Sequence, residues 1–246
     1  MEKTVLVTGV TSGFGKEIAK MFVKAGYKVI GTGRRENKLE ELKKEFGIYT
    51  ICLDVRDKDA VFKSIENLPK EYQNIDILVN NAGLALGMEK ANDALLNDWD
   101  TMIDTNIKGL LYITKAVLPN MVKRKTGYIF NLGSIAGNWP YEGGNVYGAT
   151  KSFVQQFSFN LRADLKGTNI RVSNIEPGMA KTEFSNVRFK GDDEKADAVY
   201  SDIKPLLADD IANLIFILSQ LPEHVNVTSL EVMPTVQSHG ALIIEK

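Results

Sequence analysis

The segment TVLVTGVTSGFG at residues 4–15 joins a short apolar run to a glycine-rich turn. The run at residues 4–8 is typical of a buried strand. Apolar residues then recur at helical spacing over residues 13–25. A strand, a glycine-rich turn and a helix in this order form a unit that binds the phosphates of a nucleotide.

Each glycine of the turn has a physical use. Gly9 allows a tight turn, Gly13 lets a pyrophosphate approach the backbone, and Gly15 permits close packing of the helix on the strand. The helix N-terminus then offers free N–H groups and the positive end of its dipole. The predicted phosphate loop comprises Gly9, Thr11, Ser12, Gly13, Phe14 and Gly15.

Working outward, strand-like and helix-like segments alternate along the whole chain. We expect strands at residues 4–8, 27–33, 48–54, 75–83, 127–134, 169–178 and 225–234, with long helices at 99–121 and 147–165. This alternation predicts a single doubly wound α/β Rossmann domain over residues 1–246, a parallel sheet of about seven strands with helices on both faces. The polar segment 181–204 interrupts the pattern, and we expect it to be an irregular insertion that binds substrate.

Composition narrows the class of protein. The 246 residues are 44% hydrophobic and 25% charged with a net charge of −1, which is near the average for soluble globular domains and offers no basic surface for nucleic acid. No run approaches the roughly 20 apolar residues of a membrane span. The single cysteine, Cys52, lies in an apolar run and is predicted to be buried. A cytoplasmic location is expected. No metal is expected either, because His224 and His239 are far apart and no cysteine or acidic cluster lies near them at ligand spacing.

The end of the second predicted strand identifies the nucleotide. It reads GTGRR at residues 31–35, where NAD-binding proteins carry an acid for the ribose 2′-hydroxyl. Arg34 and Arg35 are instead suited to a 2′-phosphate, through charge-assisted hydrogen bonds. This predicts NADP as the cofactor. The alternative, a solvated basic helix start, leaves the missing acid unexplained.

A tyrosine and a lysine one helical turn apart provide the candidate chemistry. In YGATK, Lys151 is expected to lower the pKa of Tyr147, which then acts as general acid in reduction and general base in oxidation. This spacing alone is frequent by chance. Ser134, at the end of the fifth predicted strand, is placed to hydrogen-bond the substrate oxygen.

The TGxxxGxG spacing and these motifs, in this order, resemble the short-chain dehydrogenase/reductase family. The resemblance implies that Asn106, in DTNIKG, completes a catalytic tetrad with Ser134, Tyr147 and Lys151, interrupts a long helix and holds a water that links Lys151 to solvent. It also implies that Lys151 binds the nicotinamide ribose. The implied cofactor contacts are Asp54 and Val55 at the adenine, Asn81 at the adenosine, and Pro177, Gly178 and Thr182 at the carboxamide.

Four stretches resemble one subgroup, the NADP-dependent 3-hydroxy acid dehydrogenases, also described as serine 3-dehydrogenases or malonic semialdehyde reductases. They are NNAGLALGMEKA, DWDTMIDTNIKGL, GNWPYEGGNVYGATK and TEFSNVRFKGDDEKA. The resemblance implies oxidation of the 3-hydroxyl of L-serine, L-allo-threonine, 3-hydroxyisobutyrate or 3-hydroxypropionate, or reduction of malonic semialdehyde. One departure is PGMAKTEF, which is shorter by a residue than the subgroup's usual run.

Recognition of a small carboxylate requires a cation or a cluster of hydrogen-bond donors. Arg188 is the candidate, because arginine pairs bidentately with carboxylates; the alternative is a surface arginine on a mobile loop. Trp139 and Tyr141 either wall the pocket or pack in the core or an interface. The competing enzymes are a 3-oxoacyl carrier-protein reductase and a broad carbonyl reductase. A non-catalytic NADP-sensing protein is a further alternative, although this chain retains Tyr147 and Lys151.

The family resemblance further implies a homotetramer. The helices predicted at residues 99–121 and 147–165 are apolar on more than one face, which fits burial against another subunit. Near the C-terminus, Leu242, Ile243 and Ile244 would be exposed in a monomer.

Overall fold

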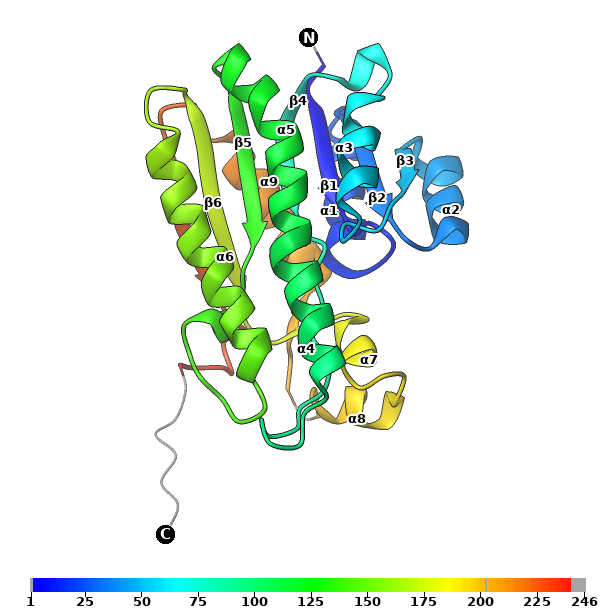
Figure 1. Ribbon diagram of the computed structural model, residues 1–246, viewed down its shortest axis with the longest axis vertical. Coiled ribbons are helices and arrows are strands. Elements are labelled where there is room, and N and C mark those ends of the chain that lie inside the picture. Colours follow the sequence, from blue (N-terminus) through cyan, green and yellow to red (C-terminus); the bar gives the residue numbers. More distant parts are fainter. Residues whose placement is uncertain (1, 202, 240–246) are drawn as a thin grey trace.

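A parallel sheet of seven strands forms the centre of the computed structural model, which describes residues 2–201 and 203–239 (Figure 1). The strands lie in the order β3-β2-β1-β4-β5-β6-β9, so the order reverses direction between β1 and β4. Their bounds are β1 Thr4–Thr8, β2 Lys28–Gly33, β3 Tyr49–Cys52, β4 Ile75–Asn80, β5 Gly127–Leu132, β6 Ile170–Pro177 and β9 Ser229–Val232. The predicted doubly wound α/β fold is confirmed, and the carboxyl ends of these strands meet at one edge, where such sheets bind ligands.

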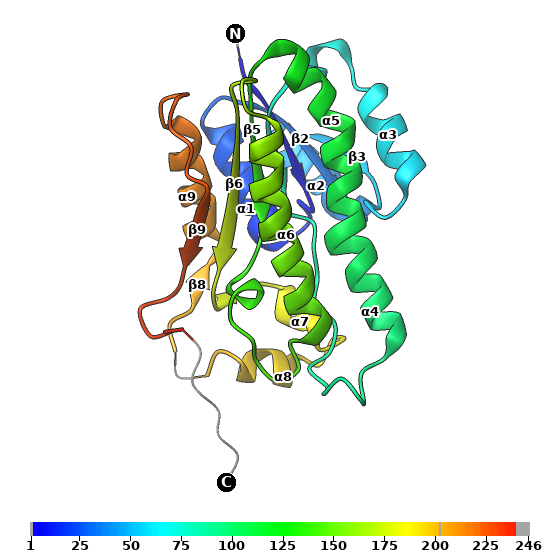
Figure 2. The same cartoon turned by 60° about the vertical axis from the view of Figure 1, so that its left-hand side comes forward.

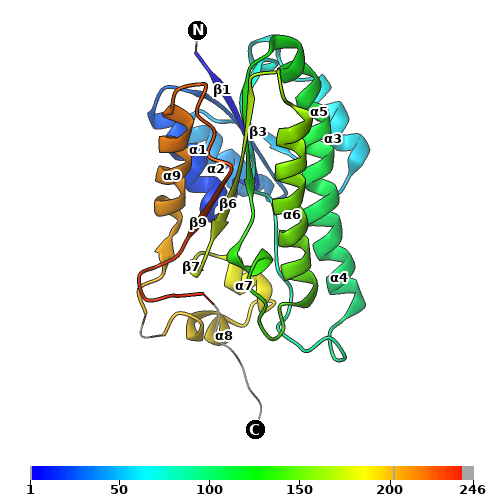
Figure 3. The same cartoon turned by 90° about the vertical axis from the view of Figure 1, so that its left-hand side faces the viewer.

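Helices cover both faces of this sheet, as Figure 3 shows edge-on. On one face lie α1 (Gly13–Lys24), α2 (Glu36–Phe46) and α9 (Ala208–Gln220). On the other lie α3 (Lys58–Glu66), α5 (Leu110–Arg124) and α6 (Asn145–Asp164). No helix of the described residues is both long and apolar enough to cross a membrane.

Two apolar layers hold the helices on the sheet. Successive residues of β1 alternate between them: Val5 and Val7 pack with α1 and α9, while Leu6 packs with α3 and α5. All three side chains are fully buried. Since both faces of the sheet are covered, its strands read in the sequence as continuous apolar runs.

The helix predicted at residues 99–121 is longer and interrupted. It begins as α4 (Leu96–Ile103), widens into a π-helix over Asp104–Gly109 and continues as α5. The extra residue in each π turn leaves local backbone groups free to bond elsewhere, and such turns are frequent at functional sites. The predicted interruption at Asn106 is therefore confirmed.

The segment 181–204 is partly regular, which corrects the expectation of an irregular insertion. It contains α7 (Phe184–Arg188) and α8 (Asp193–Ala198), between the short strands β7 (Ala180–Lys181) and β8 (Leu206–Leu207). Two helices of five and six residues are too short to give a clear periodic pattern in sequence. Both lie beyond the carboxyl ends of the strands (Figures 1 and 3).

Two further expectations need correction. Cys52 is exposed because it ends β3, which is the edge strand of the sheet. Its sulfur lies 3.8 Å from the carbonyl oxygen of Arg34. The last strand, β9, spans only Ser229–Val232 beside β6, rather than residues 225–234 (Figure 2). The apolar residues Leu242, Ile243 and Ile244 lie outside the described residues.

Candidate active site

A cavity of about 670 Å³ opens at the carboxyl ends of the strands. It brings together nearly all of the predicted site residues, although they come from segments far apart in the sequence. Those that line it are Gly9, Thr11, Ser12, Gly13, Phe14, Arg34, Arg35, Asp54, Val55, Asn81, Ser134, Tyr147, Lys151, Pro177, Gly178, Thr182 and Arg188. Gly15 and Asn106 are not part of this lining.

The glycine-rich turn adopts the conformation that its sequence predicts. Gly9 and Gly13 have φ angles of +73° and +55°, in the left-handed region that favours glycine. A Cβ on Gly15 would lie 2.4 Å from the carbonyl oxygen of Gly9. Ser12 caps α1 without a side-chain hydrogen bond, so the first N–H groups of the helix stay available to a phosphate.

Asn81 has a structural role that sequence reasoning missed. Its side-chain amide donates hydrogen bonds to the carbonyl oxygens of Thr8, at 2.7 Å, and Gly9, at 3.2 Å. The side chain of Thr8 accepts in turn from the backbone N–H of Asn81. These contacts fix the phosphate loop to the end of β4.

The corner after β2 fits a ribose that carries a 2′-phosphate. A Cβ on Gly33 would lie 2.6 Å from the Thr11 methyl, so this position has no room for an acidic side chain. Arg34 and Arg35 follow at the cavity wall. Arg35 donates to the Thr11 hydroxyl at 3.1 Å and to the Glu183 carboxylate at 2.8 Å.

Asp54, predicted to flank the adenine, is already paired. The Arg56 guanidinium donates to both of its carboxylate oxygens, at 3.0 and 2.6 Å, and holds its pKa below the usual range. With the glycine cradle and the arginine corner, this wall fits a dinucleotide with a 2′-phosphate.

Tyr147 and Lys151 lie on the face of α6 that meets the cavity, and both are buried. The expected lowering of the Tyr147 pKa by Lys151 is wrong: burial raises that pKa well above its usual range, and the opposing groups are the Ser134 hydroxyl and the Arg188 guanidinium. The Lys151 ammonium lies 5.8 Å from the centre of the Tyr147 ring and donates to the carbonyl oxygen of Leu132 at 2.7 Å. Burial lowers the pKa of Lys151 to about 8.

Asn106 ties the π-helix to both sides of the site. Its side chain accepts from the N–H of Leu84 at 2.9 Å and donates to the Leu84 carbonyl oxygen at 2.8 Å. It also donates to the hydroxyl of buried Thr150 at 3.0 Å, and that hydroxyl donates to the carbonyl oxygen of Tyr147 at 2.8 Å. Thr150 thus links Asn106 to the backbone of Tyr147, a contact that the sequence did not predict, since only the fold brings Thr150 to Asn106.

Gly83 leaves space beside Lys151. A Cβ on Gly83 would lie 3.2 Å from the Asn106 side-chain oxygen and 3.5 Å from the Lys151 nitrogen. The water that Asn106 is predicted to hold remains a prediction.

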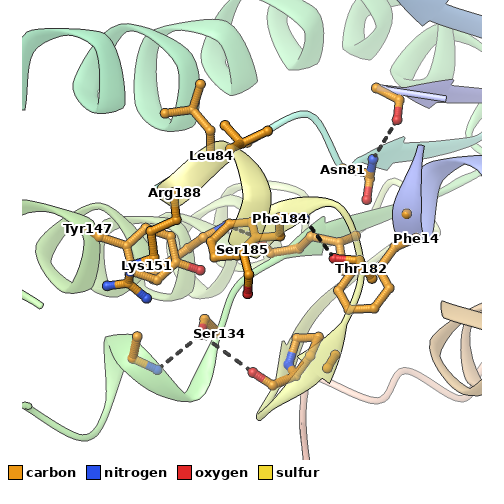
Figure 4. Close-up of a pocket in the computed structure, with 18 of the residues that line it drawn as sticks. Phe14, Asn81, Leu84, Ser134, Tyr147, Lys151, Thr182, Phe184, Ser185 and Arg188 are labelled. Atoms are coloured by element: carbon orange, nitrogen blue, oxygen red, sulfur yellow. Dashed lines mark hydrogen bonds between the residues drawn. The ribbon is translucent and has the colours of Figure 1, made fainter. Parts of the chain in front are cut away.

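The substrate side of the cavity lies between Ser134 and α7 (Figure 4). The Ser134 hydroxyl oxygen accepts from the N–H of Ala136 at 3.1 Å and lies 3.4 Å from the Pro177 carbonyl oxygen. From α7, Arg188 extends toward Tyr147, with its guanidinium carbon 5.5 Å from the ring centre. A cation and a phenol therefore face the same space.

Trp139 and His239 occupy the outer wall. The Trp139 indole donates to Glu231 at 3.0 Å and packs against the His239 ring at a centre-to-centre distance of 4.6 Å. His239, predicted to be non-catalytic, thus lines the cavity. Among the described residues, no group of three histidine, cysteine or acidic side chains is arranged to bind a metal.

Comparison with known proteins decides the family. A model of the short chain dehydrogenases matches residues 3–193. The chain belongs to this family. It is 57% identical, over 98% of its length and 99% of the relative's, to the NADP-dependent 3-hydroxy acid dehydrogenase YdfG of Escherichia coli O6:H1. It is 53% identical over the full length of both chains to sulfoacetaldehyde reductase 2 of Chromohalobacter salexigens. Among solved structures, the closed form of a serine dehydrogenase complexed with NADP⁺ superposes with a TM-score of 0.98, at 56% identity and 99% coverage of both chains.

Proposed function

We propose that this short-chain dehydrogenase uses NADP to oxidise the 3-hydroxyl of small hydroxy acids, and in reverse to reduce malonic semialdehyde. Substrates of this class are L-serine, L-allo-threonine, 3-hydroxyisobutyrate and 3-hydroxypropionate. The observation that carries the proposal is the position of Arg188, whose guanidinium faces the space above Tyr147. One end of a small acid can pair with Arg188 while its hydroxyl reaches Tyr147.

The proposed binding of NADP is supported by the residues that line the cavity and by the NADP-dependent relatives. The N-terminus of α1 binds the pyrophosphate, and Arg34 and Arg35 bind the 2′-phosphate. Asp54, Val55 and Asn81 flank the adenosine, while Pro177, Gly178 and Thr182 contact the carboxamide. When bound, NADP supplies the hydride acceptor for oxidation and the hydride donor for reduction.

The protein's own side chains position the substrate and move the proton. Ser134 hydrogen-bonds the substrate oxygen, and Tyr147 takes the hydroxyl proton in oxidation or returns it in reduction. Burial disfavours the phenolate of Tyr147. The Ser134 hydroxyl and the Arg188 guanidinium act in the opposite direction and lower the pKa of this side chain. Lys151 binds the nicotinamide ribose, and Asn106 holds the water that connects Lys151 to solvent.

The acid end of the substrate distinguishes this proposal from its competitors. A 3-oxoacyl carrier-protein reductase binds a thioester on a long phosphopantetheine arm rather than a free acid, so it does not need a guanidinium beside the reacting oxygen. A broad carbonyl reductase does not need one either. A nucleotide sensor without catalysis has no need of Tyr147 and Lys151 at the cavity wall.

We also infer that segment 181–204, which contains α7 and Arg188, is the substrate-binding insertion. We further infer that the enzyme is a cytoplasmic homotetramer.

Initial rates test the function directly. NADP⁺ and NAD⁺ are each supplied with the four acids, with the neutral 1-propanol as the comparison. We expect NADP-dependent turnover of the acids, weak turnover of the alcohol, and a loss of about 10²–10⁴-fold for Tyr147→Phe. Turnover of acetoacetyl thioesters without turnover of the acids would favour the carrier-protein reductase instead. In the reverse direction, sulfoacetaldehyde and malonic semialdehyde differ only in the anionic group, so their rates measure how strongly the site prefers a carboxylate.

A further inference from the structure

The Arg188 side chain is held by two other segments of the chain. One terminal nitrogen donates to the hydroxyl of Tyr141 at 2.7 Å, and Nε donates to the carbonyl oxygen of Gly87 at 3.2 Å. The backbone N–H of Gly87 donates to the carbonyl oxygen of Arg188 at 2.9 Å. These contacts fix α7 and its guanidinium against the rest of the cavity.

Two aromatic rings flank the same guanidinium. Its central carbon lies 5.5 Å from the ring centre of Tyr141 and 5.5 Å from that of Tyr147. Contacts of this length attract a cation to the face of a ring. Arg188 is half-buried. The guanidinium is therefore confined in the direction of the catalytic phenol.

Tyr141 is itself fixed relative to the catalytic helix. A Cβ on Gly144 would lie 2.8 Å from a carbon of the Tyr141 ring, so that ring packs directly on the backbone at the start of α6. The N–H of Gly144 also donates to the carbonyl oxygen of Tyr141 at 3.0 Å. Tyr147 follows one turn later on the same helix. The position of Tyr141 thus sets the position of Arg188 relative to Tyr147.

The charge of Arg188 is available to a ligand. Two carboxylates line the cavity, and each is paired with a different arginine: Asp54 with Arg56, and Glu183 with Arg35. Within the described residues, the second terminal nitrogen of Arg188 has no protein hydrogen-bond partner. A planar anion can therefore bind a guanidinium that is already oriented.

We propose that Tyr141 is a specificity-determining residue, which orients Arg188 as the receptor for the carboxylate of the substrate. This inference rests on the proposed function and adds to it the residue that makes the receptor selective. The hydroxyl of Tyr141 holds one edge of the guanidinium, and the opposite edge faces the anion. Preorganisation of this kind raises affinity because less side-chain freedom is lost on binding.

The test compares two substrates of the same shape, 3-hydroxypropionate and its neutral amide, 3-hydroxypropionamide. Tyr141→Phe keeps the ring and removes only the hydroxyl. We expect kcat/KM for the acid to fall about tenfold, mostly through KM, while the amide changes less than about twofold. Tyr72→Phe removes a hydroxyl from a tyrosine outside the cavity lining and is the matched control. Equal losses for acid and amide would overturn the proposal.

A double substitution separates orientation from independent binding. If Tyr141 acts through Arg188, Tyr141→Phe has no further effect on the acid in an Arg188→Ala enzyme. If the two losses multiply, Tyr141 does not act through Arg188 and the proposal fails.

A binding measurement keeps this result apart from the proposed function. Malonate presents the same carboxylate without a hydroxyl to oxidise, and its affinity for the NADP⁺-loaded enzyme is measured by calorimetry. Binding by wild type that is weakened about tenfold in Tyr141→Phe supports the receptor, even if no hydroxy acid is turned over, and in that case only the proposed function falls. Failure of malonate to bind wild type, or equal binding to both enzymes, overturns the receptor.

Discussion

The guanidinium of Arg35 donates a hydrogen bond to the carboxylate of Glu183 at 2.8 Å, across 148 positions of sequence. Arg35 also donates to Thr11, so this one side chain connects the phosphate loop to the segment that enters α7. Both partners of the ion pair are about half exposed, at 44% and 52%, and pairs of this kind contribute little to stability. We expect the pair to affect cofactor binding instead, because Glu183 places a negative charge beside the proposed site of the 2′-phosphate.

Glu183→Gln is therefore expected to tighten NADP⁺. Removal of this carboxylate frees Arg35 for the phosphate and relieves a repulsion that solvent largely screens, so we expect KM for NADP⁺ to fall about two- to threefold. KM for NAD⁺, which has no 2′-phosphate, stays constant. Initial rates at saturating substrate measure both, with Glu194→Gln on exposed α8 as the control for a lost charge. A parallel change for the two nucleotides would show that Glu183 acts on α7 and not on the phosphate.

Gly15→Ala is expected to destabilise the protein, against the usual trend in helices. Alanine normally stabilises a helix by about 1 kcal/mol over glycine. Here its Cβ would lie 2.4 Å from both the Gly9 carbonyl oxygen and the Asn81 amide nitrogen, and neither can move without opening the phosphate loop. We expect a loss of about 2 kcal/mol in the free energy of unfolding, together with weaker NADP⁺ binding. Urea unfolding and fluorescence titration measure the two effects, with Lys24→Ala in the last turn of α1 as the control. An increase in stability would contradict the packing described.

The fold could be predicted because burial on both faces makes each central strand a continuous apolar run, and helical periodicity marks what lies between. Most of the site could be predicted for a related reason: its motifs directly follow strands, and parallel strands end at one edge of the sheet. Contacts between distant segments leave no such pattern. The pairs Arg35 with Glu183 and Arg188 with Tyr141 arise only from the tertiary structure. The prediction that Cys52 is buried was wrong for a similar reason, since nothing in its apolar run indicates that β3 is the edge strand.

The described surface supports the proposed tetramer. On α6, Phe153 and Phe157 stack with ring centres 5.9 Å apart while both stay partly exposed, and Leu96 at the start of α4 is 66% exposed. Partners of the same kind on a second subunit would cover these side chains. Sedimentation equilibrium at micromolar concentration is expected to give a tetramer, and Phe153→Glu to give smaller species. Lys63→Glu on α3 changes charge without entering this face and should leave the assembly intact. A wild-type monomer would contradict the prediction.

Lys151 makes stability depend on pH in a direction that can be worked out. Its pKa is about 8 in the folded protein and 10.5 in an ordinary environment, so the folded state disfavours the charged form. Between these two values the unfolded chain binds more protons than the folded chain, and stability therefore rises with pH. Below about pH 8 the burial of the charge costs its full amount, about 3 kcal/mol.

Lys151→Met removes this cost together with the activity. The variant keeps an apolar side chain of similar length but leaves the Leu132 carbonyl oxygen without its partner, a loss of about 1 kcal/mol. We therefore expect it to be more stable than wild type by about 2 kcal/mol at pH 7, and this gain to shrink as pH rises from 8 toward 10.5. Urea unfolding without nucleotide at pH 7 and pH 9.5 measures both values. Lys166→Met, which makes the same substitution at an exposed lysine beyond α6, is the control. A gain for Lys151→Met that grows as pH rises would show that the buried ammonium is stabilised where it lies.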